Sequence, residues 1–178
     1  KANPKWLVGY SDITILHYAL QKMGIEYIHG AMTGTFTEEF DGFSQNSLKD
    51  ALFGNLAAYT TNPSKYNNFG TGKGKLIGGN ITLLRNLVGT ELDNNYDEPT
   101  ILFIEDIDEK MHKIDSKLWH LKQIGHLDKC KGIIVGYFTD IADEDLWEQS
   151  VYDLIYSYTK DLNIPVIFNF PCGHEHPN

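Results

Sequence analysis

Apolar runs of strand length alternate with helical patterns through the second half of this chain. The runs predict strands at residues 101–105, 132–138 and 166–170, and the periodicity between them predicts helices at about 116–124 and 146–159. Strands separated by helices favour right-handed βαβ crossovers, which place the strands parallel in one sheet. The alternation therefore predicts an α/β fold with βαβ units for this part of the chain.

The first part of the chain shows the same alternation of strand-like and helical patterns over a shorter length. An apolar run at residues 5–10 predicts a strand, and apolar residues at helical spacing then continue to Gly24, which ends the helix. A second run at residues 25–28 predicts another strand, and a helix is expected across 47–59. We interpret residues 1–62 as the C-terminal part of an N-terminal α/β domain.

Turn-forming composition separates the two parts of the chain. Residues 60–74 are rich in Asn, Pro, Ser, Lys, Thr and Gly, which predicts a linker and a domain boundary near Asn62. Residues 63–178 then form a C-terminal α/β domain. In that domain Asn80 follows two glycines and precedes a helical pattern, so it is a natural N-cap.

Composition narrows the class of protein. The chain has 178 residues, of which 42% are hydrophobic, and this is the balance of a globular protein. A net charge of -9 without a cluster of Lys and Arg argues against a nucleic-acid partner.

No apolar run approaches the ~20 residues of a membrane span, and no charged-then-apolar leader is present. Cys130 and Cys172 lack CxxC spacing, which favours a reduced, cytoplasmic setting.

Both ends of the chain predict a fragment. The chain starts without Met and enters its first strand almost at once, and it stops at residues 176–178 without a closing element. A strand that is buried on both faces needs neighbouring strands, and the sequence before it supplies none. We therefore expect that an upstream half is absent, together with any signal peptide that it carried.

Three residues that could cooperate in hydrolysis follow strand-like runs, namely Ser11, Glu105 and His174. In open α/β sheets, reacting groups gather beyond the carboxyl ends of the strands. A serine hydroxyl becomes a nucleophile when a base takes its proton, and a carboxylate can orient that base. The pattern predicts hydrolytic chemistry with these three side chains in one crevice.

Each of these residues, taken singly, has another interpretation. Ser11 at a helix start could be an N-cap, and its turn lacks the final Gly of a G-x-S-x-G elbow. The acidic cluster from Glu105 to Glu109 could be a solvated loop or a divalent-metal site. His174 and His176 could belong to a metal site. The residues alone leave these alternatives open.

Taken jointly, the segments resemble the LD-carboxypeptidase family of serine peptidases, and the resemblance covers nearly the whole chain. The matching segments occur in the family's order and are Gly9-Tyr10-Ser11-Asp12-Ile13-Thr14, His29-Gly30-Ala31-Met32, Gly78-Gly79-Asn80, Gly89-Thr90, Leu102-Phe103-Ile104-Glu105-Asp106 and Gly173-His174. Ala31 departs from the proline that the family has at this position.

The resemblance implies roles for individual residues. Ser11 is expected to be the nucleophile, His174 the general base and acid, and Glu105 the residue that orients His174. The backbone N–H of Asp12 is expected to contribute to the oxyanion hole, and the reaction to need no metal or other cofactor. Asn80 either binds substrate or only caps its helix. The family's Gly-rich loop that completes the oxyanion hole precedes the nucleophile and is not in this sequence, so the fragment alone is expected to be inactive.

The implied activity is that of a serine carboxypeptidase. It would hydrolyse the L,D peptide bond of murein tetrapeptide and release terminal D-Ala in peptidoglycan recycling. One alternative is a microcin C-type immunity peptidase that cleaves an aminoacyl-nucleotide antibiotic. Another is a non-catalytic module that binds a metal or a cell-wall peptide. The expected partner is a murein peptide, not a nucleic acid or a membrane, and a homodimer is an open alternative.

Overall fold

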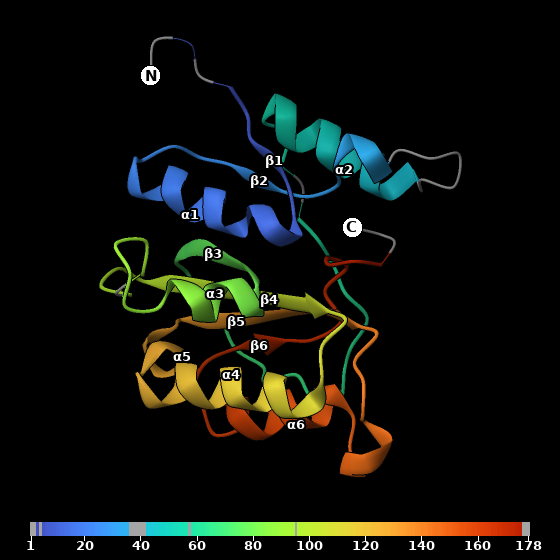
Figure 1. The fold of residues 1–178 in the computed structure, drawn as a ribbon. Helices are drawn as coiled ribbons and strands as arrows, with labels where there is room; N and C mark the ends of the chain where they lie inside the picture. Colours follow the sequence, from blue (N-terminus) through green and yellow to red (C-terminus); the bar gives the residue numbers. More distant parts are fainter. Residues whose placement is uncertain (1–2, 4, 36–41, 57, 95, 176–178) are drawn as a thin grey trace.

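The computed structural model describes residues 3, 5–35, 42–56, 58–94 and 96–175. Its strands form two separate parallel sheets, one with two strands and one with four (Figure 1). In the small sheet, β1 (Val8–Gly9) pairs with β2 (Ile28–His29). Parallel sheets joined by helices confirm the predicted α/β class.

The large sheet has the strand order β3-β4-β5-β6, and every neighbouring pair is parallel. Its strands are β3 (Lys75–Asn80), β4 (Thr100–Ile107), β5 (Gly132–Thr139) and β6 (Val166–Ile167). The three strands predicted from apolar runs are β4, β5 and β6. Strand β3 was not predicted, because two of its residues are glycines, which are uncommon in strands.

Helices form layers around the sheets. Helix α1 (Thr14–Lys22) lies between the small and the large sheet, and α2 (Gly42–Phe53) lies beyond the small sheet (Figure 1). On the opposite side of the large sheet, α4 (Met111–Gln123) packs on α6 (Val151–Thr159). The remaining helices, α3 (Ile81–Leu87) and the short α5 (His126–Lys129), both contact α4.

The core lies between the large sheet and its helices. Its largest fully buried side chains are Ile77, Ile81, Leu102, Ile104, Met111, Ile114, Leu118, Leu121, Leu127, Ile133, Ile155 and Phe168. These residues come from three strands of the sheet and from the helices that cover it, with Phe168 directly after β6. Burial of aliphatic side chains stabilises such a layer by roughly 1.5–3 kcal/mol for each large residue.

Local signals explain several boundaries. Asn80 caps α3, because its side-chain Oδ1 accepts the N–H of Leu83 at 3.2 Å, and this confirms the predicted N-cap. Helix α6 begins at Val151, later than predicted, because Ser150 and Asp153 form a capping box. The predicted helix at 47–59 was misplaced, since α2 spans Gly42–Phe53 and is followed by Gly54 in a left-handed conformation.

Part of the segment between the two parts of the chain, residues 60–74, is bonded to the large sheet. Asn68 forms an antiparallel bridge with Val166, and Asn67 Oδ1 accepts the N–H of Phe168 at 2.8 Å. Residues from about Tyr66 onward are therefore held along the β6 edge. The boundary near Asn62 stays a prediction. In the described part of the chain, no helix is long and apolar enough to cross a bilayer.

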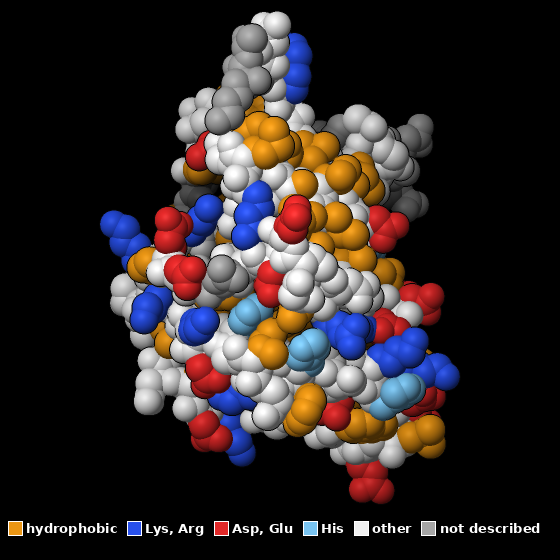
Figure 2. Space-filling view, turned by 60° about the vertical axis from the view of Figure 1, so that its left-hand side comes forward, with side chains coloured by type: hydrophobic (Ala, Val, Ile, Leu, Met, Phe, Trp, Pro, Cys, Tyr) orange, Lys and Arg blue, Asp and Glu red, His pale blue; other side chains and the backbone are white. Residues whose placement is uncertain are grey.

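The upper part of the molecule carries exposed apolar side chains, which Figure 2 shows as a band of hydrophobic residues. Trp6, Leu16 and Met23 are about half exposed here, at 47%, 51% and 56%. The strand predicted at residues 5–10 pairs with its neighbour only at Val8–Gly9. The exposed apolar side chains lie beside these paired residues, with Trp6 before β1, Leu16 on α1 and Met23 at its C-cap.

Candidate active site

Ser11 lies immediately beyond β1, in a turn that leads into α1. It begins a short 3-10 helix, Ser11–Ile13, and its backbone is left-handed, with a φ of 62°. The N-cap positions of the two consecutive helices are Tyr10 and Ile13, so the interpretation of Ser11 as an N-cap is wrong. Non-glycine residues rarely adopt this strained conformation, and those that do are concentrated at functional sites.

Glu105 and Asp106 lie near the carboxyl end of β4 and are almost completely buried, with exposed fractions of 0% and 2%. The solvated-loop interpretation is therefore wrong for these two residues. Burial raises the pKa of the Glu105 carboxyl, and the hydrogen bond and charge of His174 act in the opposite direction. The other carboxylate oxygen, Oε1, is buried and has no hydrogen-bond partner among the described residues.

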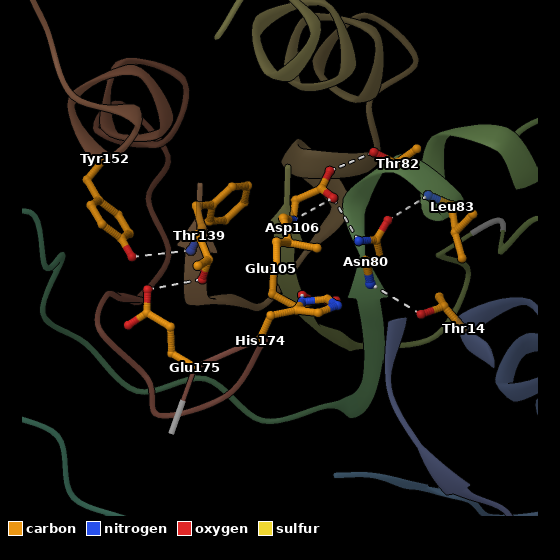
Figure 3. A network of polar contacts seen from close by, with 12 residues as sticks. Thr14, Asn80, Thr82, Leu83, Glu105, Asp106, Thr139, Tyr152, His174 and Glu175 are labelled. Carbon is orange, nitrogen blue, oxygen red and sulfur yellow. Dashed lines mark hydrogen bonds and ion pairs between the residues drawn. The ribbon is translucent and has the colours of Figure 1, made fainter. Parts of the chain in front are cut away.

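His174 contacts Glu105 directly. Its Nδ1 lies 2.9 Å from Glu105 Oε2, and Figure 3 shows the imidazole beside the carboxylate. In the tautomer with a proton on Nδ1, the ring donates this hydrogen bond and leaves Nε2 free to accept a proton. Only 12% of the His174 side chain is exposed. This is the carboxylate–histidine geometry that a general base requires.

Two contacts fix the loop that carries His174. The N–H of Tyr137 donates to the carbonyl of Cys172 at 2.8 Å, and Thr139 Oγ1 bonds Glu175 Oε1 at 3.1 Å. Both anchoring residues lie on β5, so the loop is held against the end of the sheet. His174 is thereby positioned by a rigid element although it lies outside any strand itself.

Ser11 is brought close to this pair through its neighbour. The Tyr10 ring packs edge-on against the His174 ring, with 4.9 Å between the ring centroids. Within the described residues, no hydrogen bond joins Ser11 to His174. The structure therefore shows the Glu105–His174 contact and places Ser11 next in sequence to the residue that touches His174.

Asn80 lies beside the pair, because it is the register partner of Glu105 across β3 and β4. Its side-chain Nδ2 donates to Asp106 Oδ1 at 2.7 Å, while its Oδ1 caps α3. The side chain is thus held at both ends, and 6% of the residue is exposed. A role for Asn80 in substrate binding stays a prediction.

Asp12 follows Ser11 in the same 3-10 turn. The N–H groups at a helix start have no acceptor within their own helix, so they can donate to an oxyanion. The position of Asp12 is compatible with its predicted role, which stays untested. Among the described residues, no group of three or more His, Cys, Asp or Glu could hold a metal ion. His176 lies outside the described residues.

Two polar residues support the site in a way that the sequence did not predict. Thr14 and Thr82 are bonded to Asn80 and Asp106 respectively, at 3.2 and 2.6 Å. Threonine is common at the start of a helix for purely local reasons, so the residue type of Thr14 and Thr82 did not indicate a role in the site. Their partners lie far along the chain, and only the tertiary structure identifies them.

A cavity of about 890 Å³ lies between the small sheet, α2 and the large sheet. Most of the side chains that line it are apolar, and the lining also includes His29 and Cys172. Ser11, Glu105 and His174 do not line this cavity. The residues that could do chemistry lie outside this cavity. We therefore do not assign the substrate to it.

A parallel α/β fold with a carboxylate–histidine pair at the carboxyl ends of its strands defines the class of this protein. Residues 73–178 match the model of the LD-carboxypeptidase C-terminal domain, and residues 1–30 match that of the N-terminal domain. The chain belongs to the LD-carboxypeptidase family, whose members are serine peptidases.

Similar proteins include a probable murein peptide carboxypeptidase of Bacillus subtilis, which is 33% identical over 100% of this chain and 57% of its own length. The crystal structure of muramoyltetrapeptide carboxypeptidase from Oxalobacter formigenes is 29% identical, with a TM-score of 0.79 over 96% of this chain and 59% of that protein. This chain thus spans somewhat more than half the length of such relatives.

The microcin C7 self-immunity protein MccF of Escherichia coli is also similar. Its structure in complex with glutamyl sulfamoyl guanosine is 26% identical, with a TM-score of 0.79 over 99% of this chain and 62% of that protein. The relatives therefore include proteins named as murein peptide carboxypeptidases and one named for self-immunity to microcin C7, and the fold alone does not choose between these activities.

Proposed function

We propose that this chain carries the catalytic residues of a serine carboxypeptidase that hydrolyses the L,D peptide bond of murein tetrapeptide and releases D-Ala. The observation that carries the proposal is the buried Glu105–His174 contact of 2.9 Å beside the strained Ser11 turn. Relatives named as murein peptide and muramoyltetrapeptide carboxypeptidases support the choice of substrate. We place the reaction in cytoplasmic peptidoglycan recycling.

The proposed mechanism uses the side chains of Ser11, His174 and Glu105 and the backbone N–H of Asp12. His174 Nε2 accepts the proton of Ser11 as its Oγ attacks the carbonyl carbon, and Glu105 stabilises the imidazolium that forms. The Asp12 N–H donates to the oxyanion of the tetrahedral intermediate. His174 then protonates the departing amino group of D-Ala. A water molecule, deprotonated by the same histidine, hydrolyses the acyl-enzyme and frees Ser11.

The proposed site is divided between the two parts of the chain. Ser11 belongs to the small-sheet part, whereas Glu105 and His174 belong to the large-sheet part. We propose that residues 1–62 and 63–178 correspond to these parts, and that full activity needs the additional length that the relatives possess. A second oxyanion donor is expected in that additional length.

Mass spectrometry of murein tetrapeptide tests this proposal. The peptide is incubated with this chain and, separately, with a version extended upstream to the length of its relatives. We expect loss of one alanine with the extended protein and none with its Ser11→Ala variant, since loss of a triad residue removes most of the rate. No loss of alanine with the extended wild-type protein would contradict the proposal.

The similarity to MccF favours a second candidate, a peptidase that cleaves an aminoacyl-nucleotide antibiotic. Such a substrate calls for an aromatic side chain that can stack on the base. Trp119 is exposed, but it lies on α4, on the side of the sheet away from α1. A competition assay with both substrates measures which kcat/KM is larger, and a preference for the nucleotide would select this candidate.

A further inference from the structure

We propose that Thr14 is a positioning residue that holds the nucleophile turn in register with Glu105. This inference rests on the proposed function, because it concerns the placement of Ser11 relative to the Glu105–His174 pair. Thr14 is the first residue of α1 and is completely buried. The Thr14 hydroxyl contacts neither Glu105 nor His174. The role of Thr14 is therefore to position the reacting groups and not to react itself.

Thr14 is bonded to both parts of the site. Its backbone N–H donates to the carbonyl of Ser11, which closes the 3-10 turn around the nucleophile. Its side-chain Oγ1 accepts the backbone N–H of Asn80 at 3.2 Å (Figure 3). Asn80 is in turn the register partner of Glu105. One residue therefore links the Ser11 turn to the strand beside the catalytic carboxylate.

Glycine at position 79 makes this contact possible. A Cβ on Gly79 would lie 2.5 Å from Thr14 Oγ1 and 2.9 Å from its Cγ2, and φ is +136° at this residue. A side chain here would push Thr14 away from β3. Gly79 thus permits close approach of the nucleophile helix, a backbone function that requires no ligand.

The Asn80 end of this link is held rigidly by hydrogen bonds. Asp106 Oδ1 accepts from Asn80 Nδ2 and from the N–H of Ile107, while Oδ2 accepts from Thr82 at 2.6 Å. The ammonium group of Lys117, also buried, lies 3.7 Å from the same carboxylate oxygen. A network in which each member is bonded holds its geometry well. The N–H group that Thr14 Oγ1 accepts therefore belongs to Asn80, a residue whose position this network fixes.

The division of the site makes such a link important. Among the described residues, no strand of the small sheet pairs with a strand of the large sheet, so side-chain and helix contacts between the parts set the distance between Ser11 and His174. A displacement of about 1 Å in reacting groups can reduce a rate by about 100-fold. Loss of the Thr14 hydroxyl should thus lower the rate of chemistry more than it lowers substrate binding.

The test uses the extended protein with Thr14→Val, which keeps the shape and removes the hydroxyl, and Thr14→Ser, which keeps the hydroxyl. Release of D-Ala gives kcat and KM, and the rate of labelling by a fluorophosphonate reports how strongly Ser11 is activated. We expect Thr14→Val to lower both kcat and the labelling rate by about 10- to 100-fold at nearly constant KM. Thr14→Ser should restore most of both rates.

Thr159→Val is the matched control. Thr159 is a buried threonine on α6, and its hydroxyl bonds the carbonyl of Ile155 at 3.1 Å, on the far side of the sheet. Its loss should reduce the melting temperature without altering labelling. If Thr14→Val does not fold, Thr14→Ala provides the same comparison, with labelling expressed per folded molecule.

The possible results separate the two proposals. An active wild type with equally rapid labelling of Thr14→Val would overturn the positioning role and leave the proposed function intact. Equal losses in Thr14→Val and Thr14→Ser would also overturn it, because packing would then matter and the hydroxyl would not. A wild type that is neither labelled nor active would overturn both.

Discussion

Ser11 adopts a backbone conformation that non-glycine residues seldom adopt, and this strain is measurable. At a φ of 62°, glycine relieves the steric clash that alanine and serine both suffer. We expect Ser11→Gly to be more stable than Ser11→Ala by about 0.5–1 kcal/mol, after allowance for the greater freedom of unfolded glycine. Urea unfolding of both variants measures the difference. A more stable alanine variant would mean that the turn carries no strain.

Glu105 supplies a second test at the level of one residue. Replacement by glutamine keeps the shape but removes the charge that stabilises the His174 imidazolium, so we expect kcat for D-Ala release to fall by about 10³- to 10⁴-fold in the extended protein. Asp108→Asn is the matched control, because Asp108 is an exposed member of the same acidic cluster. Equal effects of the two substitutions would contradict a specific role for Glu105.

Helix α6 illustrates how a local signal fixes an element. Ser150 Oγ accepts the N–H of Asp153 at 3.1 Å, and the Asp153 carboxylate accepts the N–H of Ser150 at 3.0 Å. Ser150→Ala removes half of this capping box, and we expect it to cost about 1 kcal/mol. The exposed Ser157 within the same helix is the control, since Ser157→Ala should change stability little. Chemical denaturation of the two variants provides the comparison.

At the scale of elements, prediction succeeded where hydrophobicity is periodic and local. Strands β4 and β5 were evident because they contain the unbroken apolar runs 101–104 and 133–135, as expected for strands covered on both faces. Strand β3 was missed because its glycines are selected by close contacts, with Phe103 at Gly78 and with Thr14 at Gly79. Those contacts exist only after the sheet has formed.

Two histidines with buried ring nitrogens make the stability of the folded molecule sensitive to acid. The ring nitrogens of His17 and His29 have no hydrogen-bond partner in the described part of the chain. Burial lowers the pKa of His17 to about 4, and burial together with the charges of His17 and His174 lowers the pKa of His29 to about 3. Both residues therefore stay neutral in the folded chain at pH values where the unfolded chain binds protons.

We expect stability to be complete above about pH 6.5 and to fall as the pH drops toward 4, by up to about 1.4 kcal/mol per pH unit for each histidine. His17→Phe should reduce this slope while keeping the ring stack on Tyr27, where the centroids are 4.2 Å apart. His112→Phe, at an exposed position of α4, is the control. Urea midpoints measured across this pH range provide the test, and an unchanged slope in His17→Phe would contradict it.

The parallel α/β class, the order of the family's segments and the Asn80 cap could be predicted from residue patterns, because each depends on residues that are close together in the chain. The burial of Glu105, its bond to His174, 69 residues away, and the contact of Thr14 with Asn80, 66 residues away, became visible once the chain was folded. Local patterns specify strands and helices, whereas the contacts between distant side chains depend on how those elements pack.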